Sequence, residues 1–101
     1  MMKNILSRKT LREFWEIPKY KDSEEPLKVW YDEVSKASWQ TPNDVKKQFG
    51  NASIVGNSKI VFNIKGNDYR LVVEINYKFQ YVYVLWIGTH TEYDKIDVTK
   101  I

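Results

Sequence analysis

A cluster of side chains able to carry chemistry follows the last apolar run of the chain, between residues 88 and 95. It brings together a histidine, a tyrosine, two carboxylates and a lysine: His90, Glu92, Tyr93, Asp94 and Lys95. The end of a strand and the loop after it are common places for functional sites. Such a cluster could cut RNA without a metal ion. In that reaction the 2′-hydroxyl loses a proton and attacks the adjacent phosphorus, the leaving 5′-oxygen gains a proton, and the charge on the phosphate is neutralised.

The chemistry of each residue type suggests which step of the cleavage it could serve. His90 can transfer a proton, because an imidazole exchanges protons near neutral pH. Arg70, Lys59 or Lys65 can hold the phosphate, and of the three the arginine offers a fork of donors. Tyr93 can stack on a base or join the proton transfers. Since the chain has one histidine, an acid–base pair of two histidines is excluded.

Each of these residues also has a structural interpretation. A lone histidine in a loop is more often a surface or structural residue than a catalytic one. Tyr93 is equally well explained as a half-buried aromatic. Arg70 could form an ion pair with Glu74 or Glu92.

The second half of the chain predicts the strands that would position the cluster. Apolar residues alternate with a more polar set, which includes Val61 and Val72, over 60–64 and 69–77, and a longer apolar run covers 81–87. The turns between them, at 66–68 and 78–80, are short enough to force antiparallel neighbours. We therefore expect a three-stranded meander.

The alternation also sorts residues onto two faces of this sheet. One face is wholly apolar or aromatic and should be the core: Tyr69, Leu71, Val73, Ile75 and Tyr77. Arg70 then lies on the opposite, more polar face, which we expect to be partly open to solvent. Asn63 and Lys65 sit on the polar side of the preceding strand and should lie near it. A cation and an amide on an open face would form a phosphate platform, although an ordinary surface strand shows the same pattern.

The first half of the chain predicts a short strand and helices. Residues 3–6 read as the strand, and a helix over 10–17 follows Ser7 and ends at Pro18. After a polar connector over 19–22, the strongest helical periodicity covers 24–37, with Ser23 as its N-cap. A short third helix begins at Thr41 or Asn43 and stops at Gly50.

Length and composition narrow the possible classes of protein. A chain of 101 residues predicts one domain, 1–101, and 43% hydrophobic with 15% aromatic residues excludes intrinsic disorder. Trp30 and Trp86 are most simply core residues. The absence of cysteine and the single histidine exclude disulfides, a thiol nucleophile and zinc–sulfur or histidine-rich metal sites, so we expect no cofactor. Nucleotide-binding, metalloprotease and serine hydrolase motifs do not occur.

Charge and hydropathy bear on the ligands and the cellular location of the chain. The net charge of +3 is mildly basic, with basic stretches at 1–12 and 45–70 and an acidic one at 13–33. This distribution suits a protein that touches phosphate with one face, and an ordinary solvated surface explains it as well. Residues 1–6 are too short and polar for a targeting segment, and the run 81–87 is too short to span a membrane. We therefore expect a cytoplasmic protein.

A set of motifs resembles the HigB family of toxins. The motifs are Val61-Phe62-Asn63-Ile64, Gly66-Asn67, Tyr69-Arg70-Leu71-Val72-Val73, Thr89-His90 and Glu92-Tyr93-Asp94. Segments 7–16 and 52–57 resemble the same family. The order and spacing of FN, GN-x-x-R and TH-x-EYD are fairly specific, and the resemblance covers nearly the whole chain.

The resemblance implies an α+β, RelE-like fold, with helices packed on one face of the meander. It also implies the toxin of a type II toxin–antitoxin pair that cleaves mRNA, usually on translating ribosomes. The implied partner is a HigA-like antitoxin with a helix-turn-helix domain, through which the complex would bind operator DNA. Because the same fold hosts gyrase-poisoning toxins, a non-enzymatic inhibitor or a plain RNA-binding module are the alternatives.

Residue by residue, the resemblance implies a nuclease site. Arg70 matches the sheet arginine that holds the scissile phosphate. His90 and Tyr93 match a C-terminal pair that would serve proton transfer, with base stacking as a second role for Tyr93. Asp94 would orient one of the two.

Three further residues are implied to bind RNA. Asn63 occupies the polar position of the FN motif and would organise the site or contact RNA. Lys59 and Lys65 add positive charge at positions that are less fixed in the family.

Overall fold

The sheet is wider than the predicted meander. A computed structural model describes residues 1–2, 4–56 and 58–101, and within them five strands form one mixed sheet in the order β1-β5-β4-β3-β2. The strands are β1 (Asn4–Leu6), β2 (Ser53–Val55), β3 (Lys59–Ile64), β4 (Tyr69–Asn76) and β5 (Tyr81–Thr89). The antiparallel meander β3-β4-β5 is confirmed. At the two edges, β1 pairs parallel to β5 and β2 pairs antiparallel to β3. Lys3, the first residue of the predicted strand, lies outside the described residues.

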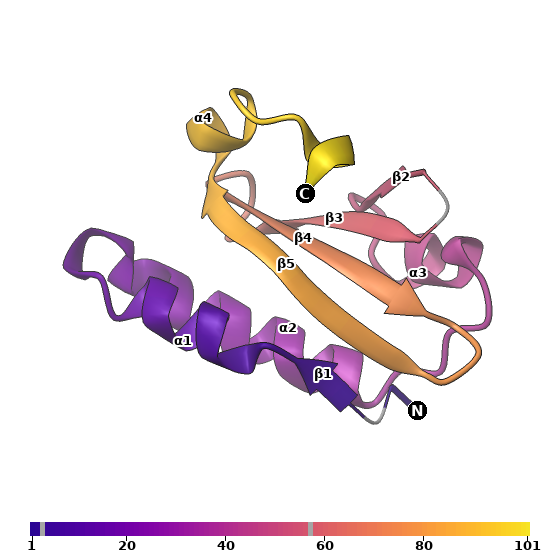
Figure 1. Ribbon diagram of the computed structural model, residues 1–101. Coiled ribbons are helices and arrows are strands. Elements are labelled where there is room, and N and C mark those ends of the chain that lie inside the picture. The colour runs from indigo at the N-terminus through magenta and orange to yellow at the C-terminus, as the bar shows by residue number, and fades with distance from the viewer. Residues whose placement is uncertain (3, 57) are drawn as a thin grey trace.

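The helices form a layer on one face of the sheet, as expected for this α+β fold. They are α1 (Arg8–Trp15), the 3-10 helix η1 (Pro18–Ser23), α2 (Glu24–Ser35) and α3 (Pro42–Gln48). Figure 1 shows α1 and α2 running along one side of the sheet, while α4 and the C-terminal end lie on the other. We call the face of the sheet away from α1 and α2 the open face.

A side-chain cap marks the start of α3 but not of α1 or α2, where Ser7 and Ser23 make no capping hydrogen bond. Thr41 and Asp44 form a capping box at the start of α3, in which each side chain accepts from the other residue's backbone. Ser23 was expected to cap α2, but its hydroxyl donates to the Tyr20 carbonyl at 2.7 Å. It therefore closes a turn of η1, which replaces the predicted polar connector. Two carboxylates in the first turn of α2, Glu24 and Glu25, complement the helix dipole instead.

The core lies between the helices and the predicted apolar face of the sheet. Its buried residues come from both layers and include Leu11, Leu27, Trp30, Val34, Ile60, Phe62, Leu71, Val73 and Val82. Trp86 was expected in this core, but it lies partly exposed on the open face. Val61 and Val72 also lie on the open face, yet both are buried. This burial fits the return of the chain beyond β5 over that face in Figure 1.

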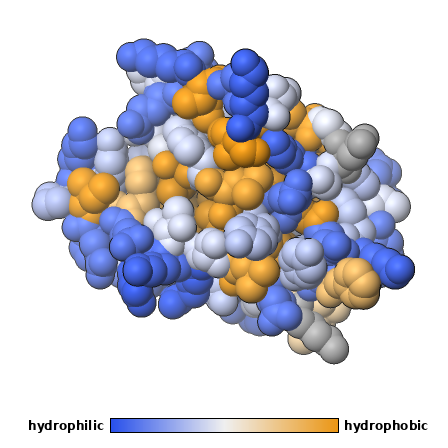
Figure 2. Space-filling view, in the orientation of Figure 1, coloured by the Kyte–Doolittle hydropathy of each residue, from blue (hydrophilic) through white to orange (hydrophobic). Residues whose placement is uncertain are grey.

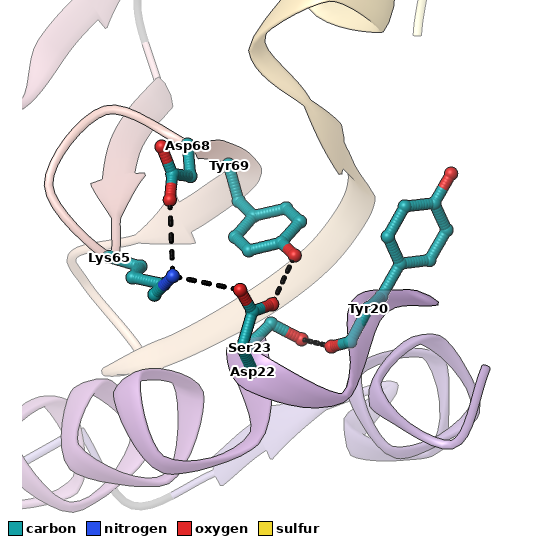
Figure 3. Close-up of polar contacts among 6 residues, drawn as sticks. All are labelled: Tyr20, Asp22, Ser23, Lys65, Asp68 and Tyr69. Carbon is teal, nitrogen blue, oxygen red and sulfur yellow. Dashed lines mark hydrogen bonds and ion pairs between the residues drawn. The ribbon is translucent and has the colours of Figure 1, made fainter. Parts of the chain in front are cut away.

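One polar cluster ties the β3–β4 turn to the helical layer, as Figure 3 shows. The Lys65 amine lies 2.8 Å from a carboxylate oxygen of Asp22 in η1 and 3.3 Å from one of Asp68. The Tyr69 hydroxyl donates to the other oxygen of Asp22. Lys65 has a left-handed backbone with φ of 53°, so the turn itself directs the side chain toward η1. The cluster therefore fixes the turn from which Arg70 emerges.

The cluster should make stability depend on pH at both extremes. The hydrogen bonds from Lys65 and Tyr69 lower the pKa of Asp22 from its usual 3.8. The contribution of Asp22 to the stability of the fold is therefore present above that pH and lost as the pH falls below it. Burial, with the Asp22 carboxylate, raises the pKa of Tyr69 from 10.0 to about 12, so its contribution is lost as the pH rises through that interval. The melting temperature of Asp22→Asn should fall less steeply toward acid pH than that of wild type. The melting temperature of Tyr69→Phe should fall less steeply toward alkaline pH. Melting temperatures that differ from wild type by the same amount at every pH would contradict this assignment.

Candidate functional site

Arg70 lies on the open face, near the start of the central strand β4. In the β3–β4 register Asn63 lies opposite Arg70, and in the β4–β5 register Gly88 lies opposite it. Directly opposed residues project to the same face, so the amide of Asn63 and the cation of Arg70 are neighbours. The predicted proximity of these two residues is thus confirmed.

A one-turn helix, α4 (His90–Tyr93), follows β5 directly and was not predicted. Thr89 and Glu92 form its capping box: the Thr89 hydroxyl accepts from the Glu92 amide at 3.1 Å, and the Glu92 carboxylate accepts from the Thr89 amide at 2.9 Å. The His90 amide donates to the Asp68 carbonyl at 3.0 Å, which ties α4 to the β3–β4 turn. The spacing T-x-x-E is the signature that could have revealed this helix.

The guanidinium of Arg70 lies against an aromatic ring and a neutral amide. Its central carbon is 5.9 Å from the centre of the Tyr93 ring, within cation–π range. One Nη donates to the side-chain oxygen of Asn67 at 2.7 Å. Within the described residues, the alternative interpretation of Arg70, an ion pair with Glu74 or Glu92, is not formed. The positive charge therefore remains available to an anionic ligand.

His90 presents an accessible imidazole beside a carboxylate. Its Nε2 lies 3.4 Å from Oδ2 of Asp94, and 43% of the side chain is exposed. His90 and Tyr93 share the single turn of α4, so the two predicted residues hold a fixed relation to each other. The arrangement combines an imidazole and an aromatic ring on one helical turn, with a fixed cation against that ring.

Lys59 lies on the open side of the molecule, engaged with the end of the chain. Its amine donates to the carbonyl oxygens of Val98, Thr99 and Ile101 at 3.4, 3.4 and 2.8 Å. These carbonyls belong to the 3-10 helix η2 (Val98–Lys100) and the residue after it. A lysine at a helix C-terminus satisfies carbonyls that have no partner within the helix. Lys59 thus fastens the segment that follows α4 to β3.

Of the other predicted residues, Asn63 lies near Arg70 and Lys65 does not. The Asn63 amide nitrogen donates weakly, at 3.4 Å, to the Asn51 carbonyl, beside a cavity of about 130 Å³. Lys65 was expected near Arg70, but its amine is bound to Asp22 on the helical side. The reason is the left-handed turn conformation, which ends the alternation of β3 one residue before Lys65.

Two residues that the sequence did not assign to the site, Trp86 and Gly88, complete the open face. The Trp86 and Tyr93 rings are 6.2 Å apart and tilted by 52°. A Cβ built on Gly88 would lie 2.5 Å from Cη2 and 2.6 Å from Cζ2 of Trp86, so the indole lies directly over this glycine. Trp86 reaches the open face because a bulge at Leu85 shifts the register, with Val73 opposite Val84 and Val72 opposite Trp86.

The arrangement agrees with a family assignment. Residues 23–96 match the model of the HigB toxin family, described as the RelE-like toxic component of a toxin–antitoxin system. The chain belongs to the HigB toxin family. No curated protein matches it. The resemblance read from the sequence motifs is therefore confirmed, and the RelE-like expectation fits the observed fold.

HigB membership gives the chain a partner class, an antitoxin. The matched segment contains Arg70, Asn63, His90 and Tyr93. In the part of the chain that the structure describes, no group of three or more histidine, cysteine, aspartate or glutamate side chains is arranged to hold a metal ion. Nor is any helix there long and apolar enough to cross a membrane.

Proposed function

We propose that this HigB-family chain is an mRNA interferase, a metal-independent endoribonuclease that cuts mRNA on the ribosome. The observation that carries the proposal is the position of Arg70. Its guanidinium stands on the open face without a carboxylate partner among the described residues, against the Tyr93 ring and one strand away from the turn that bears His90. This combination supplies what cleavage by the 2′-hydroxyl requires.

Arg70 would bind the scissile phosphate. A guanidinium matches two phosphate oxygens with parallel hydrogen bonds and keeps its charge at every relevant pH. As the 2′-oxygen attacks, negative charge grows on the phosphate oxygens, and a fixed cation stabilises that charge more than it stabilises the ground state. Asn63, opposite Arg70 in the register, would donate to the same phosphate or its ribose.

His90 and Tyr93 would share the proton transfers. One takes the proton of the 2′-hydroxyl as the O2′–P bond forms, and the other gives a proton to the 5′-oxygen as the P–O5′ bond breaks. The products are a 2′,3′-cyclic phosphate and a 5′-hydroxyl, and no co-reactant is consumed. Asp94 would act as a positioning residue, because its carboxylate lies 3.4 Å from Nε2 of His90. Either order of the two proton carriers is compatible with the geometry.

The remaining predicted residues have supporting parts in this proposal. Tyr93 and Trp86 present rings on which a base could stack next to the phosphate. Lys59 would contribute charge and hold the segment after α4. Lys65, paired with Asp22, would act on RNA binding only through the turn that it holds. The partner would be a HigA-like antitoxin whose helix-turn-helix domain carries the complex to operator DNA, and the site of action would be the cytoplasm.

Induction of the chain in bacteria, with mapping of RNA 5′ ends, tests the proposal. We expect growth arrest and new ends inside translated mRNA, and these ends should carry 5′-hydroxyls that become ligatable after phosphorylation by a kinase. Blocking translation initiation should remove the cuts if the ribosome is required. Arrest without new ends would refute the nuclease and favour an inhibitor that binds another target.

Gly88→Ala should damage the site while leaving the fold intact. The new Cβ would stand 2.5 Å from the Trp86 ring, so the indole must swing away from its place beside Tyr93. Because small displacements in a reacting site are costly, we expect roughly tenfold to hundredfold slower cleavage. Cleavage rates and melting temperatures should be compared with Gly50→Ala, where an added Cβ meets nothing within 4 Å. Cleavage by Gly88→Ala at the rate of the Gly50 control would show that the ring position is irrelevant.

A further inference from the structure

The open face carries a line of aromatic side chains that leads away from Arg70. In the β4–β5 register Trp86 lies opposite Val72, Tyr83 opposite Glu74 and Tyr81 opposite Asn76. The β4 partners alternate with buried core residues, so they and Arg70 share the open face. With Tyr93 from α4 these rings form what we call the aromatic strip: Tyr81, Tyr83, Trp86 and Tyr93.

Tyr83 is the exposed member of the strip, and Tyr81, Trp86 and Tyr93 are partly exposed. Tyr83 is 45% exposed, and its neighbour in the β1–β5 register, Leu6, is 39% exposed. Figure 2 shows apolar residues beside pale ones of intermediate hydropathy, the colour range of tyrosine and tryptophan, across the middle of the view, with hydrophilic residues around them. A contiguous exposed apolar patch with a polar rim is typical of a binding surface.

We propose that the aromatic strip binds single-stranded RNA, with bases that flank the scissile phosphate stacking along β5. This inference rests on the proposed function, because it takes the phosphate at Arg70 as its starting point. Tyr83 lies opposite Glu74, four residues from Arg70 along β4, which is roughly 13 Å of strand. A few nucleotides of extended RNA span that distance, so the same strand reaches both residues.

The composition of the face favours RNA over a protein ligand. Every base has a π-face, so flat rings in a row bind single strands without regard to sequence. The strip meets the cation through Tyr93, and the side-chain amide of Asn63 stands on the same face to bond ribose or base edges. The Asn76 amide accepts from the Phe79 backbone and donates to the Tyr81 hydroxyl at 3.4 Å, so it supports the strip. Glu74 is the carboxylate opposite Tyr83, and it accepts from the Ser58 hydroxyl at 3.3 Å. An antitoxin segment is the competing occupant, and the experiment below separates the two.

The test uses the full chain and a 2′-O-methyl RNA oligonucleotide, which cannot be cut because its 2′-oxygen is blocked. Fluorescence anisotropy of the labelled oligonucleotide should show roughly five- to tenfold weaker binding by Tyr83→Ala. Tyr83→Leu, which keeps apolar bulk without a π-face, should bind as weakly as the alanine variant, and Tyr83→Phe should bind like wild type. Phe79→Ala is the matched control, because Phe79 is 67% exposed but lies in the β4–β5 turn, off the sheet face. Melting temperatures confirm that each variant is folded.

Several outcomes would overturn the inference. Wild-type affinity in Tyr83→Ala, restored affinity in Tyr83→Leu, an equal loss in Phe79→Ala, or no binding by wild type would each do so. Unchanged oligonucleotide binding with weakened antitoxin binding in Tyr83→Ala would assign the strip to the antitoxin. Cleavage is measured separately: if wild type cuts no mRNA while the Tyr83 series behaves as expected, the nuclease proposal fails and the RNA surface stands.

Discussion

Replacing Arg70 by alanine is expected to reduce mRNA cleavage by about 10²–10³-fold, the range seen when one stabilising donor of a transition-state charge is lost. Growth arrest should disappear with the cuts. Arg70→Lys should recover little of the activity, because an ammonium keeps the charge but lacks the planar fork that binds two oxygens. The measurement is the rate of cleavage of a defined mRNA on purified ribosomes, with 5′ ends mapped in induced cells.

The Arg70 variants should remain folded, which makes the result interpretable. The guanidinium contacts Asn67 and the Tyr93 ring at the surface, and neither contact is part of the hydrophobic core. Arg12→Ala provides a matched control, since Arg12 is an exposed arginine of α1 in the helical layer. Full cleavage by Arg70→Ala, or equal loss in Arg12→Ala, would remove Arg70 from the proposed role.

The sequence predicted the parts of the fold that depend on local pattern. The alternation over 69–77 identified the core face correctly, and the short turn after Ile64 correctly placed Asn63 beside Arg70. The edge strands are different. β2 has three residues, too few to show a period, and the parallel pairing of β1 with β5 joins the two ends of the chain. Such pairings are decided by tertiary packing and leave no local signal.

The positions of site residues could be predicted where the backbone register sets them. They could not be predicted where a long side chain or a bulge sets them. Lys65 is drawn to Asp22, which is 43 residues away, and Lys59 reaches carbonyls about as distant. A flexible lysine finds whichever partner the fold brings near, so its spacing in the sequence says little. Trp86 was assigned to the core, but the bulge at Leu85 shifts the register and places it on the open face.

Replacing His90 by alanine should lower the cleavage rate by about 10²–10⁴-fold, the usual contribution of a positioned proton donor or acceptor. The fold should survive, because the helix is held by the Thr89–Glu92 capping box and by the His90 backbone amide, which the substitution keeps. Glutamine at the same position retains hydrogen bonding without proton transfer, so His90→Gln should be as slow as His90→Ala. Single-turnover cleavage on ribosomes, with both variants folded, is the measurement.

Asp94→Asn tests whether Asp94 acts through His90 or acts on the RNA itself. If the carboxylate of Asp94 positions the imidazole, this variant should be impaired less than His90→Ala. In the background of His90→Ala the Asp94 substitution should then cost nothing further, because its effect acts through the imidazole. Additive losses in the double variant would show that Asp94 acts on RNA independently. Unimpaired cleavage by both His90 variants would leave Tyr93 and the ribosome to supply the protons, and would reduce this chain's part to holding the phosphate at Arg70.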